Sequence, residues 1–512
     1  MRISERMSRY LSLFLCLSSG ALATLGFFFP GAYFWTIVGF AVFFWLLASA
    51  KRPLWGSLFG FSFGLAYFAF GLSWIFPAVY VHGNAPWLFS VLAVLALSGV
   101  LSIFPTLVGF LSTKISTTPA VKTAFVLPLL WTCFEFLRGE WICGFGWLST
   151  GYAFVDNLLS EYAPLLGGYG VGLVVLLVTG GACAVFLRQE GRAIRLLAGF
   201  VSALLVVGAY FLQNVQWSSP AERLEVRLVQ PDLAVTTRAT FRAQASALER
   251  VRSMSEMRPM GRPLDLIIWP ESVYAFLPQR LPDSWVKVPR RVAEAQTCEV
   301  LYNAFSESGR NAIFNSIFLA TESQESRIYS KRHLVPFGER VPFGFRWLIN
   351  ALGIPMADQQ VGSPPSAEVR VAGVPVALGI CYENLFAGEL RDWFLVSNPQ
   401  FVVYSANLGW FAESVVGQFT QMSRMRARES ARPVLQIVNN SGSALLDARG
   451  GVERLAGRGA QNLDVLFRST SGELTPFMQY GFSLLFAFGL LLFATVFLIC
   501  RLARCFSRKS LD

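Results

Sequence analysis

The sequence predicts an α-helical transmembrane bundle of about eight spans, joined to an extramembrane α/β domain. The 512 residues are 54% apolar and only 15% charged, with a mean hydropathy of +0.48, whereas soluble domains carry about 25% charged residues. Charged residues and prolines become frequent near residue 214, and no further run that could cross a membrane follows until residue 480. The predicted domains are therefore residues 1–213, residues 214–479, and residues 480–512 with a last span and a tail.

The apolar runs are each about long enough to cross a hydrocarbon core of about 30 Å. They lie at 11–29, 32–50, 54–76, 86–112, 121–137, 165–187, 194–213 and 480–500. Pro105 in the fourth run predicts tilt or a kink. Gly56, Gly60 and Gly64 recur at four-residue spacing in the third run, which favours close helix packing. The first run could be the core of a signal peptide, but the series of spans that follows favours an uncleaved helix.

Basic residues predict the orientation of these spans. They precede the first span, occupy alternate loops and follow the last span: Arg2, Arg6, Arg9, Lys51, Arg52, Lys114, Lys122, Arg188, Arg192, Arg195, Arg501, Arg504, Arg508 and Lys509. The opposite short loops have few basic residues, and Arg138 is the main exception. Because loops rich in Lys and Arg stay in the cytoplasm, we expect both termini there and residues 214–479 in the periplasm or its equivalent. This spread of charge argues against nucleic-acid binding despite a net charge of +11.

The polar segment alternates strands with helices. Strands are predicted where apolar residues alternate or form short runs, at 224–228, 264–272, 299–305, 315–321, 376–381, 401–407 and 434–440. Helices are predicted at 239–257 and 413–431. This alternation, together with hairpin-like pairs of strands, indicates an α/β layered fold.

Cys381 ends the apolar run VPVALGI and is followed by Tyr382 and Glu383. A strand end is a common position for a reactive side chain, because a rigid element aims it at a cleft. The alternative is a cysteine that packs as a small hydrophobe, as most free cysteines do. The eight cysteines are scattered with no CxxC pair, and the only histidines are His82 and His333. We therefore expect neither a metal site nor a Ser-His-Asp triad.

Two further polar residues follow apolar runs. Glu271 comes after LDLIIWP, where partial desolvation would suit a general base. The alternative is a strand-end carboxylate in a salt bridge or in water. Lys331 could stabilise a developing oxyanion and lower the pKa of a nearby thiol, or it could be a solvated surface lysine. Together with Cys381, the two residues form a self-consistent set of base, oxyanion stabiliser and nucleophile.

The motifs around these residues resemble the nitrilase (carbon–nitrogen hydrolase) superfamily, and most closely its membrane branch, the apolipoprotein N-acyltransferases. They are WPES at 269–272, KRHLVPFGERVP at 331–342, GICYEN at 379–384, N-x-x-WF at 407–411 and M-x-R-M-R-A-R-E at 422–429. The resemblance implies an αββα sandwich and a catalytic triad of Glu271, Lys331 and Cys381. It also implies supporting roles for Glu339, Tyr382 and Glu383.

The same resemblance implies a reaction. An acyl chain would pass from a phospholipid to the N-terminal α-amine of diacylglyceryl-cysteine in apolipoproteins, through a thioester on Cys381. We expect the site at the periplasmic surface of a bacterial inner membrane, in a monomer that needs no cofactor. Candidate substrate or lipid contacts are Asn407, Trp410, Phe411 and the apolar segment 343–356, with ordinary core or lid packing as the alternative for the apolar ones.

Two other functions stay open at this point. A membrane-tethered amidase or nitrilase would use the same triad with water as acceptor, but a soluble substrate needs only one anchor rather than many spans. A transporter or lipid-binding protein would have an inert outer domain, yet the spans lack charged pairs, and Glu135 comes closest to one.

The chain departs from the family's usual pattern in two places, and it holds a second cysteine in the predicted outer domain. Pro231 and Asp232 follow Gln230, just after the first predicted strand, and Leu408 and Gly409 precede the Trp-Phe pair. These departures bear on substrate contacts and leave the triad intact. We also expect Cys298 not to be bonded to Cys381, because a disulfide would remove the nucleophile.

Overall fold

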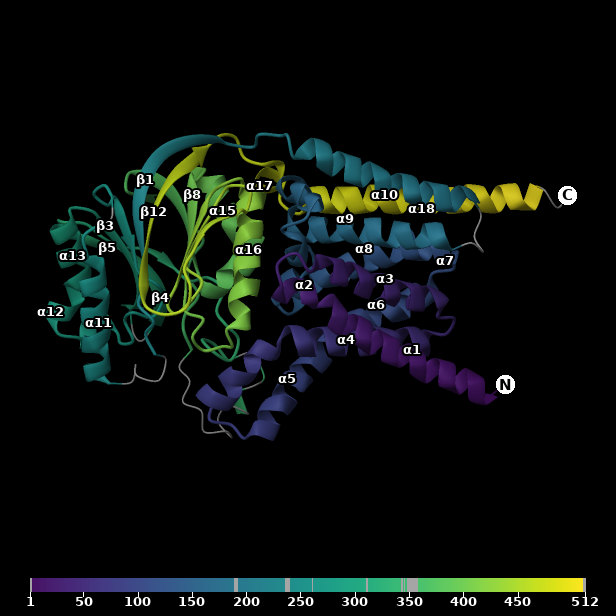
Figure 1. Cartoon of the computed structure of the whole chain (residues 1–512), viewed down its shortest axis with the longest axis horizontal. Coiled ribbons are helices and arrows are strands. Elements are labelled where there is room, and N and C mark those ends of the chain that lie inside the picture. Colours follow the sequence, from purple (N-terminus) through teal and green to yellow (C-terminus); the bar gives the residue numbers. More distant parts are fainter. Residues whose placement is uncertain are drawn as a thin grey trace. The chain divides into compact units, whose positions relative to one another are not determined.

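The computed structural model describes residues 2–187, 192–234, 240–259, 261–309, 312–341, 344, 346–347 and 358–509, with side chains described between residues 9 and 498. It divides into two compact units, residues 1–216 with 480–512 and residues 217–479. Figure 1 labels most of the helices and several of the strands.

The first unit is built from apolar helices. They are α1 (Arg2–Ala23), α2 (Leu25–Phe28), α3 (Tyr33–Ser49), α4 (Pro53–Gly71), α5 (Trp87–Leu101), α6 (Ile103–Lys114), α7 (Pro119–Val121), α8 (Leu127–Phe136), α9 (Ala163–Phe186), α10 (Arg192–Leu212) and α18 (Ser483–Lys509). In the described part of the chain, 6 helical stretches are long and apolar enough to cross a membrane, and the shorter apolar helices Tyr33–Ser49 and Ser483–Leu498 accompany them. All the apolar runs therefore form helices, while a total of about eight spans stays a prediction.

The long fourth run is interrupted at Ser102, which separates α5 from α6 just before Pro105. A proline lacks the N–H that would continue the helical ladder, so a break near it is expected. α4 lies close against α6 through its glycines. A Cβ on Gly60 would lie 2.1 Å from the carbonyl oxygen of Pro105, and one on Gly56 would lie 2.4 Å from that of Gly109. Only glycine permits this approach, so the close packing predicted from the glycine row is confirmed.

The second unit contains two six-stranded sheets. One has the order β12-β1-β2-β3-β4-β5, with β1 (Ser219–Gln230), β2 (Leu266–Ile268), β3 (Glu299–Ser308), β4 (Ala312–Ala320), β5 (Glu325–Ser330) and β12 (Gln461–Ser471). The other has the order β11-β10-β9-β8-β7-β6, with β6 (Arg370–Val371), β7 (Val374–Ile380), β8 (Phe401–Ala406), β9 (Val434–Val438), β10 (Ala444–Leu446) and β11 (Val452–Leu455). In each sheet the three strands β1–β3 or β7–β9 pair in parallel, and the flanking strands are antiparallel.

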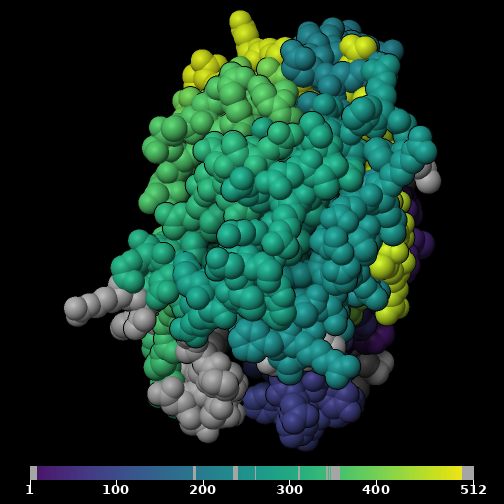
Figure 2. Space-filling model, turned by 90° about the vertical axis from the view of Figure 1, so that its left-hand side faces the viewer, coloured from purple at the N-terminus to yellow at the C-terminus, as the bar shows by residue number. Residues whose placement is uncertain are grey.

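Helices cover the outer face of each sheet (Figure 1). α11 (Phe241–Ser255), α12 (Asp283–Val286) and α13 (Val288–Gln296) lie on one side, α15 (Ala387–Ser397) and α16 (Ser414–Ser430) lie on the other, and α17 (Pro476–Tyr480) follows β12. The layer of α11, α12 and α13 faces the viewer in Figure 2, in teal. Across the two sheets, the Ser405 hydroxyl on β8 donates to Asn303 Oδ1 on β3 at 2.6 Å. This helix–sheet–sheet–helix layering is the αββα sandwich that the resemblance implied.

Candidate active site

Cys381 lies at a sharp turn between β7 and a short 3₁₀ helix, Cys381–Leu385. Its φ angle is +52°, in the left-handed region that non-glycine residues rarely adopt. Such strain persists only where the surrounding structure holds the residue in place. Asn384 holds the turn in place, because its Nδ2 donates to the Phe419 carbonyl and to the Ser423 hydroxyl of α16, each at 3.1 Å. The sheet and α16 together therefore fix the position of the thiol.

Glu271 lies just beyond the end of β2 and is almost fully buried. The neighbouring Trp269 anchors this segment, because its indole N–H donates to the Ser255 hydroxyl of α11 at 2.9 Å. The carboxylate of Glu271 accepts a hydrogen bond from Asn315 Nδ2 at 2.8 Å and another from the Asn407 backbone N–H at 3.1 Å. Segments from β2, β4 and β8 thus orient one carboxylate.

Lys331 directly follows β5, and only 1% of its side chain is exposed. Its Nζ lies 2.8 Å from Glu339 Oε1 and 3.6 Å from Glu271 Oε1. Glu339 is held in turn by the Val335 N–H, which donates to its other oxygen at 2.8 Å. The alternative of a solvated surface lysine is therefore excluded, and the ammonium lies between two carboxylates.

The surroundings set the charge states of the lysine and the cysteine. Burial lowers the pKa of Lys331, but the carboxylates of Glu339 and Glu271 more than offset this and raise its pKa overall. Burial raises the pKa of the Cys381 thiol and the Glu271 carboxylate raises it further, while Lys331 and a hydrogen bond from the Asn407 backbone oppose the rise. The ammonium is therefore charged at neutral pH, whereas the thiol is protonated and needs a base before it can attack.

Glu383 connects the segment that carries Lys331 to the turn that carries Cys381. Its two oxygens accept hydrogen bonds from the hydroxyl of Tyr329 (2.8 Å) and from the backbone N–H groups of Arg332 (2.5 Å), His333 (3.2 Å) and Ile380 (2.6 Å). Two of these donors are the residue after Lys331 and the residue before Cys381. One buried carboxylate therefore sets the distance between two strand ends.

Glu383 also predicts a pH-dependent stability. Burial and, to a smaller extent, the Glu389 carboxylate raise the pKa of Glu383 from the ordinary 4.5 to about 7, while the N–H donors of Ile380 and Arg332 oppose this rise. Because the folded protein then holds the proton more tightly than the unfolded chain, this contribution to stability is complete below about pH 4.5 and is lost as the pH rises through about 7. We expect the unfolding temperature of the wild type to fall by several degrees more than that of Glu383→Gln between about pH 5 and pH 8.

Thermal unfolding of both purified proteins in the same detergent checks this expectation. Each protein is compared with itself across pH, so that the constant cost of placing an amide among four hydrogen-bond donors cancels. Parallel curves for the two proteins would contradict a titration of Glu383 in this range.

Asn407 brings an unused hydrogen-bond donor to the site. Its Oδ1 accepts from the Gly409 N–H at 3.2 Å and from Asn439 Nδ2 at 3.3 Å, which fixes the orientation of the amide. Its Nδ2 is buried and has no hydrogen-bond partner among the described residues. An unpaired buried donor costs about 1–3 kcal/mol, so this amide is well suited to a substrate acceptor atom.

The predicted supporting residue Tyr382 and the other predicted substrate contacts differ in exposure. Tyr382 is buried, and its ring lies edge-on to Phe386 with centroids 5.4 Å apart. Trp410 is 41% exposed and Phe411 is half-buried. The apolar segment 343–356 lies outside the described residues, apart from Gly344, Arg346 and Trp347.

Sequence reasoning missed three residues of this site. Asn315 donates to Glu271, Tyr329 donates to Glu383, and Asn439 donates to Asn407. A partial signal exists for Tyr329, because the two-residue period of a strand places it on the same face as Lys331. The amides of Asn315 and Asn439 are visible in the sequence only as polar residues beside apolar runs.

Cys298 and His333, the other cysteine and the histidine of the second unit, fit structural roles. In the described part of the chain, no group of three or more His, Cys, Asp and Glu side chains could hold a metal ion. Cys298 is a free thiol in the core between the first sheet and its helices, and Cys381 is also free. The ring of His333 stacks on Phe386 with centroids 3.5 Å apart, and its Nδ1 lies 2.7 Å from Glu389 Oε1.

Comparison with known proteins connects both units to one family. The family model described as apolipoprotein N-acyltransferase N-terminal domain matches residues 19–181, and the one described as carbon–nitrogen hydrolase matches residues 226–469. An apolipoprotein N-acyltransferase of Ralstonia nicotianae is 30% identical over 475 residues, which cover 90% of this chain and 88% of that protein. The chain belongs to the apolipoprotein N-acyltransferase family.

Other similar proteins belong to the same family or to the wider superfamily. An apolipoprotein N-acyltransferase of Bordetella bronchiseptica is 32% identical over 472 residues, 85% of each chain. A solved structure of a CN-hydrolase superfamily protein from Xanthomonas campestris has 17% identity and a TM-score of 0.36, and it covers 48% of this chain and 91% of its own. As a member of the apolipoprotein N-acyltransferase family with several apolar helices, the chain is a bacterial membrane protein.

Proposed function

We propose that this protein transfers an acyl chain from a membrane phospholipid to the N-terminal α-amine of diacylglyceryl-cysteine in apolipoproteins, through a thioester on Cys381. Family membership supports the overall reaction. One arrangement supports the route: a protonated thiol held at a strained turn, in the electrostatic field of the Glu271 carboxylate and the charged Lys331. Such a set performs acyl transfer without a metal.

In the first half-reaction, Cys381 Sγ attacks the ester carbonyl of the phospholipid while Glu271 takes the thiol proton. The Lys331 ammonium stabilises the negative charge that develops on the carbonyl oxygen. The ester C–O bond then breaks, the leaving lysophospholipid oxygen receives the proton from Glu271, and the acyl group remains on sulfur as a thioester.

In the second half-reaction, the α-amine of the acceptor attacks the thioester carbonyl. Glu271 accepts a proton from the amine, the C–S bond breaks, and the sulfur of Cys381 recovers the proton as the amide product leaves. A thioester suits this step because it keeps the acyl group reactive toward an amine.

The ammonium of Lys331 interacts more strongly with the carboxylate of Glu339 than with that of Glu271. Nζ lies 2.8 Å from Glu339 Oε1 but 3.6 Å from Glu271 Oε1. The shorter contact keeps the lysine charged and in place, while the looser one leaves Glu271 available for proton transfer. We assign Glu339 and Glu383 to positioning, and Asn407, Trp410 and Phe411 to substrate contact.

We place the site on the periplasmic side of the bacterial inner membrane, in a monomer whose two termini are cytoplasmic. The basic residues of alternate loops support this orientation. The exposed ring of Trp410 is compatible with a site at the membrane surface, where lipid-anchored substrates are found.

The test is a two-step labelling experiment with purified protein in detergent. Incubation with phospholipid carrying a labelled acyl chain is expected to give a hydroxylamine-sensitive label on the protein. Addition of a diacylated lipopeptide is then expected to move the label to the peptide's α-amine. A wild-type protein that takes up no label would overturn the proposal, and release of the label as free fatty acid in the presence of lipopeptide would favour a hydrolase.

A further inference from the structure

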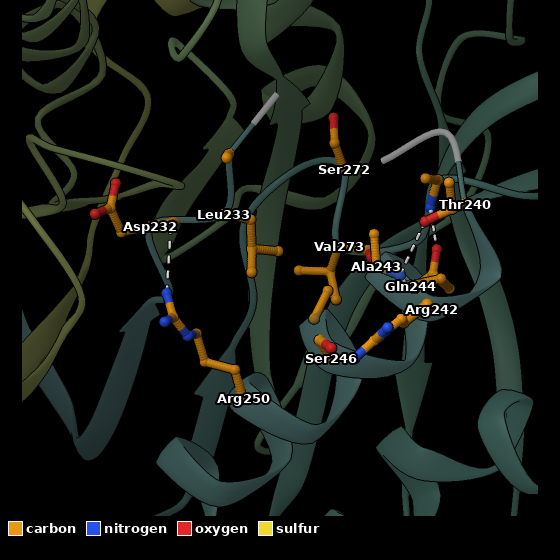
Figure 3. Close-up of a pocket in the computed structure, with 13 residues that line it drawn as sticks. Asp232, Leu233, Thr240, Arg242, Ala243, Gln244, Ser246, Arg250, Ser272 and Val273 are labelled. Atoms are coloured by element: carbon orange, nitrogen blue, oxygen red, sulfur yellow. Dashed lines mark hydrogen bonds between the residues drawn. The ribbon is translucent and has the colours of Figure 1, made fainter. Parts of the chain in front are cut away.

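A cavity of about 590 Å³ lies beside α11 in the second unit (Figure 3). Its walls come from three segments: the chain after β1 with Leu233, the first turns of α11 with Ser246, and the loop after Glu271 with Ser272 and Val273. The catalytic roles proposed above leave this cavity without a function.

Hydrogen bonds connect the cavity wall to the candidate active site. The backbone N–H and carbonyl of Leu233 pair with the side chain of Asn439 at 2.9 Å and 2.8 Å. Asn439 also donates to Asn407 at 3.3 Å, and the Asn407 N–H donates to the Glu271 carboxylate at 3.1 Å. Ser272 in the same wall directly follows Glu271. Two walls of the cavity are therefore linked to the proposed general base, one by the chain itself and one by hydrogen bonds.

The cavity also carries an excess of positive charge. Arg242 and Arg250 both line it from α11, where a spacing of eight residues places them on the same side of the helix. Arg250 donates to the backbone carbonyls of Pro231 and Asp232 at 3.1 Å and 3.4 Å, which hold its guanidinium without neutralising it. Neither arginine forms an ion pair with a carboxylate within the described ranges, and Asp232 is the one acidic residue of the lining.

We propose that this cavity binds the phosphate of the phospholipid acyl donor, with Arg242 and Arg250 as its cationic partners. The inference rests on the proposed function. In a glycerophospholipid only the glycerol backbone separates the acyl ester from the phosphate, so a carbonyl held at Cys381 places the phosphate nearby. Guanidinium groups bind phosphate oxygens through charge-assisted hydrogen bonds. The hydroxyls of Ser246 and Ser272 add neutral donors to the same lining.

Two acyl donors separate recognition of the phosphate from chemistry at the thiol. One is a phospholipid in detergent micelles, and the other is a p-nitrophenyl ester of the same fatty acid, which has no phosphate. For Arg242→Gln and Arg250→Gln, we expect the rate of thioester formation from the phospholipid to fall about tenfold, in keeping with the loss of one charge-assisted hydrogen bond. The rate from the p-nitrophenyl ester is expected to stay unchanged.

Arg252→Gln is the matched control, because Arg252 lies on the same helix but outside the cavity. It is paired with Glu249 at 2.8 Å and with Glu256 at 3.2 Å. This variant should retain the wild-type rate with both donors. Millimolar inorganic phosphate should slow labelling of the wild type by phospholipid and have no such effect on Arg242→Gln.

Four results would overturn the inference. The first is an unchanged rate of thioester formation from the phospholipid in both arginine variants, and the second is an equal loss of rate with both donors. The third is a defect in these variants that is confined to discharge of the thioester by lipopeptide. The fourth is inhibition of the wild type by inorganic phosphate while the variants keep the wild-type preference between the two donors. The third result would assign the cavity to the acceptor, and the fourth to free phosphate. A wild type that forms no thioester from either donor would instead contradict the proposed function itself.

Discussion

Replacement of Cys381 by alanine is expected to abolish the hydroxylamine-sensitive acyl label and the transfer of acyl chains to lipopeptide. Among the thiols whose side chains the structure describes, only the pKa of Cys381 is shifted by both Glu271 and Lys331. Alanine has the same Cβ as cysteine, so the strain at φ +52° is unchanged and the fold is expected to persist. The label is measured after gel separation with and without hydroxylamine, alongside thermal unfolding of the same sample.

Cys298→Ala is the matched control for this prediction. Cys298 is also a free, largely buried thiol of the same unit, but it belongs to the core between the first sheet and its helices. Burial raises the pKa of Cys298 to about 12, and no lysine lies among the groups that shift it. This variant should keep the label. Retention of the label by Cys381→Ala, or its loss from Cys298→Ala with the fold intact, would remove Cys381 as the nucleophile.

Replacement of Glu271 by glutamine is expected to slow thioester formation by about 10²–10⁴-fold, the usual contribution of a general base. Burial raises the pKa of the Cys381 thiol above its ordinary value, so hardly any thiolate is present at neutral pH and attack needs a proton acceptor. Glutamine has the same shape and can still accept the hydrogen bond from Asn315, but it cannot take a proton. Single-turnover labelling by phospholipid, sampled over time, measures the rate.

The variant Glu339→Gln tests whether Glu271 acts as a proton acceptor or only as a negative charge that keeps Lys331 protonated. Glu339 lies closer to Nζ than Glu271 does, at 2.8 Å against 3.6 Å. If Glu271 acted only by holding the lysine charged, loss of Glu339 would be at least as damaging. A base role for Glu271 requires the larger loss in Glu271→Gln, and equal rates in the two variants would contradict it.

The sequence predicted helices and strands most successfully where apolar residues form a continuous run. The apolar helices of the first unit and the buried strands β2, β7, β8 and β9 consist of apolar runs, and these elements were predicted. β5 and β11 were not, because ESRIYS and VERL are polar strands of the sheet flanks. Their hydrogen bonds go to partners that the local sequence does not reveal. β12 likewise depends on β1, with which it pairs along almost its whole length.

The two-part architecture and the three residues of the proposed triad could be predicted before any contact between segments was known. A long apolar run must cross a membrane or be buried. A polar residue at the end of a buried strand is a candidate for a site, but each of the three also had an ordinary structural alternative. The architecture needs only local pattern, whereas Glu271, Lys331 and Cys381 were selected by their combination and by the motifs around them.

The interactions among these residues became visible in the folded structure. It brought Lys331 nearer to Glu339 than to Glu271, raised the pKa of the thiol by burial, and linked two strand ends through Glu383. It also placed two arginines of α11 in the wall of a cavity that Ser272, the residue after Glu271, lines as well. Charge states and distances depend on desolvation and on contacts between segments far apart in the chain, and no local run of residues encodes them.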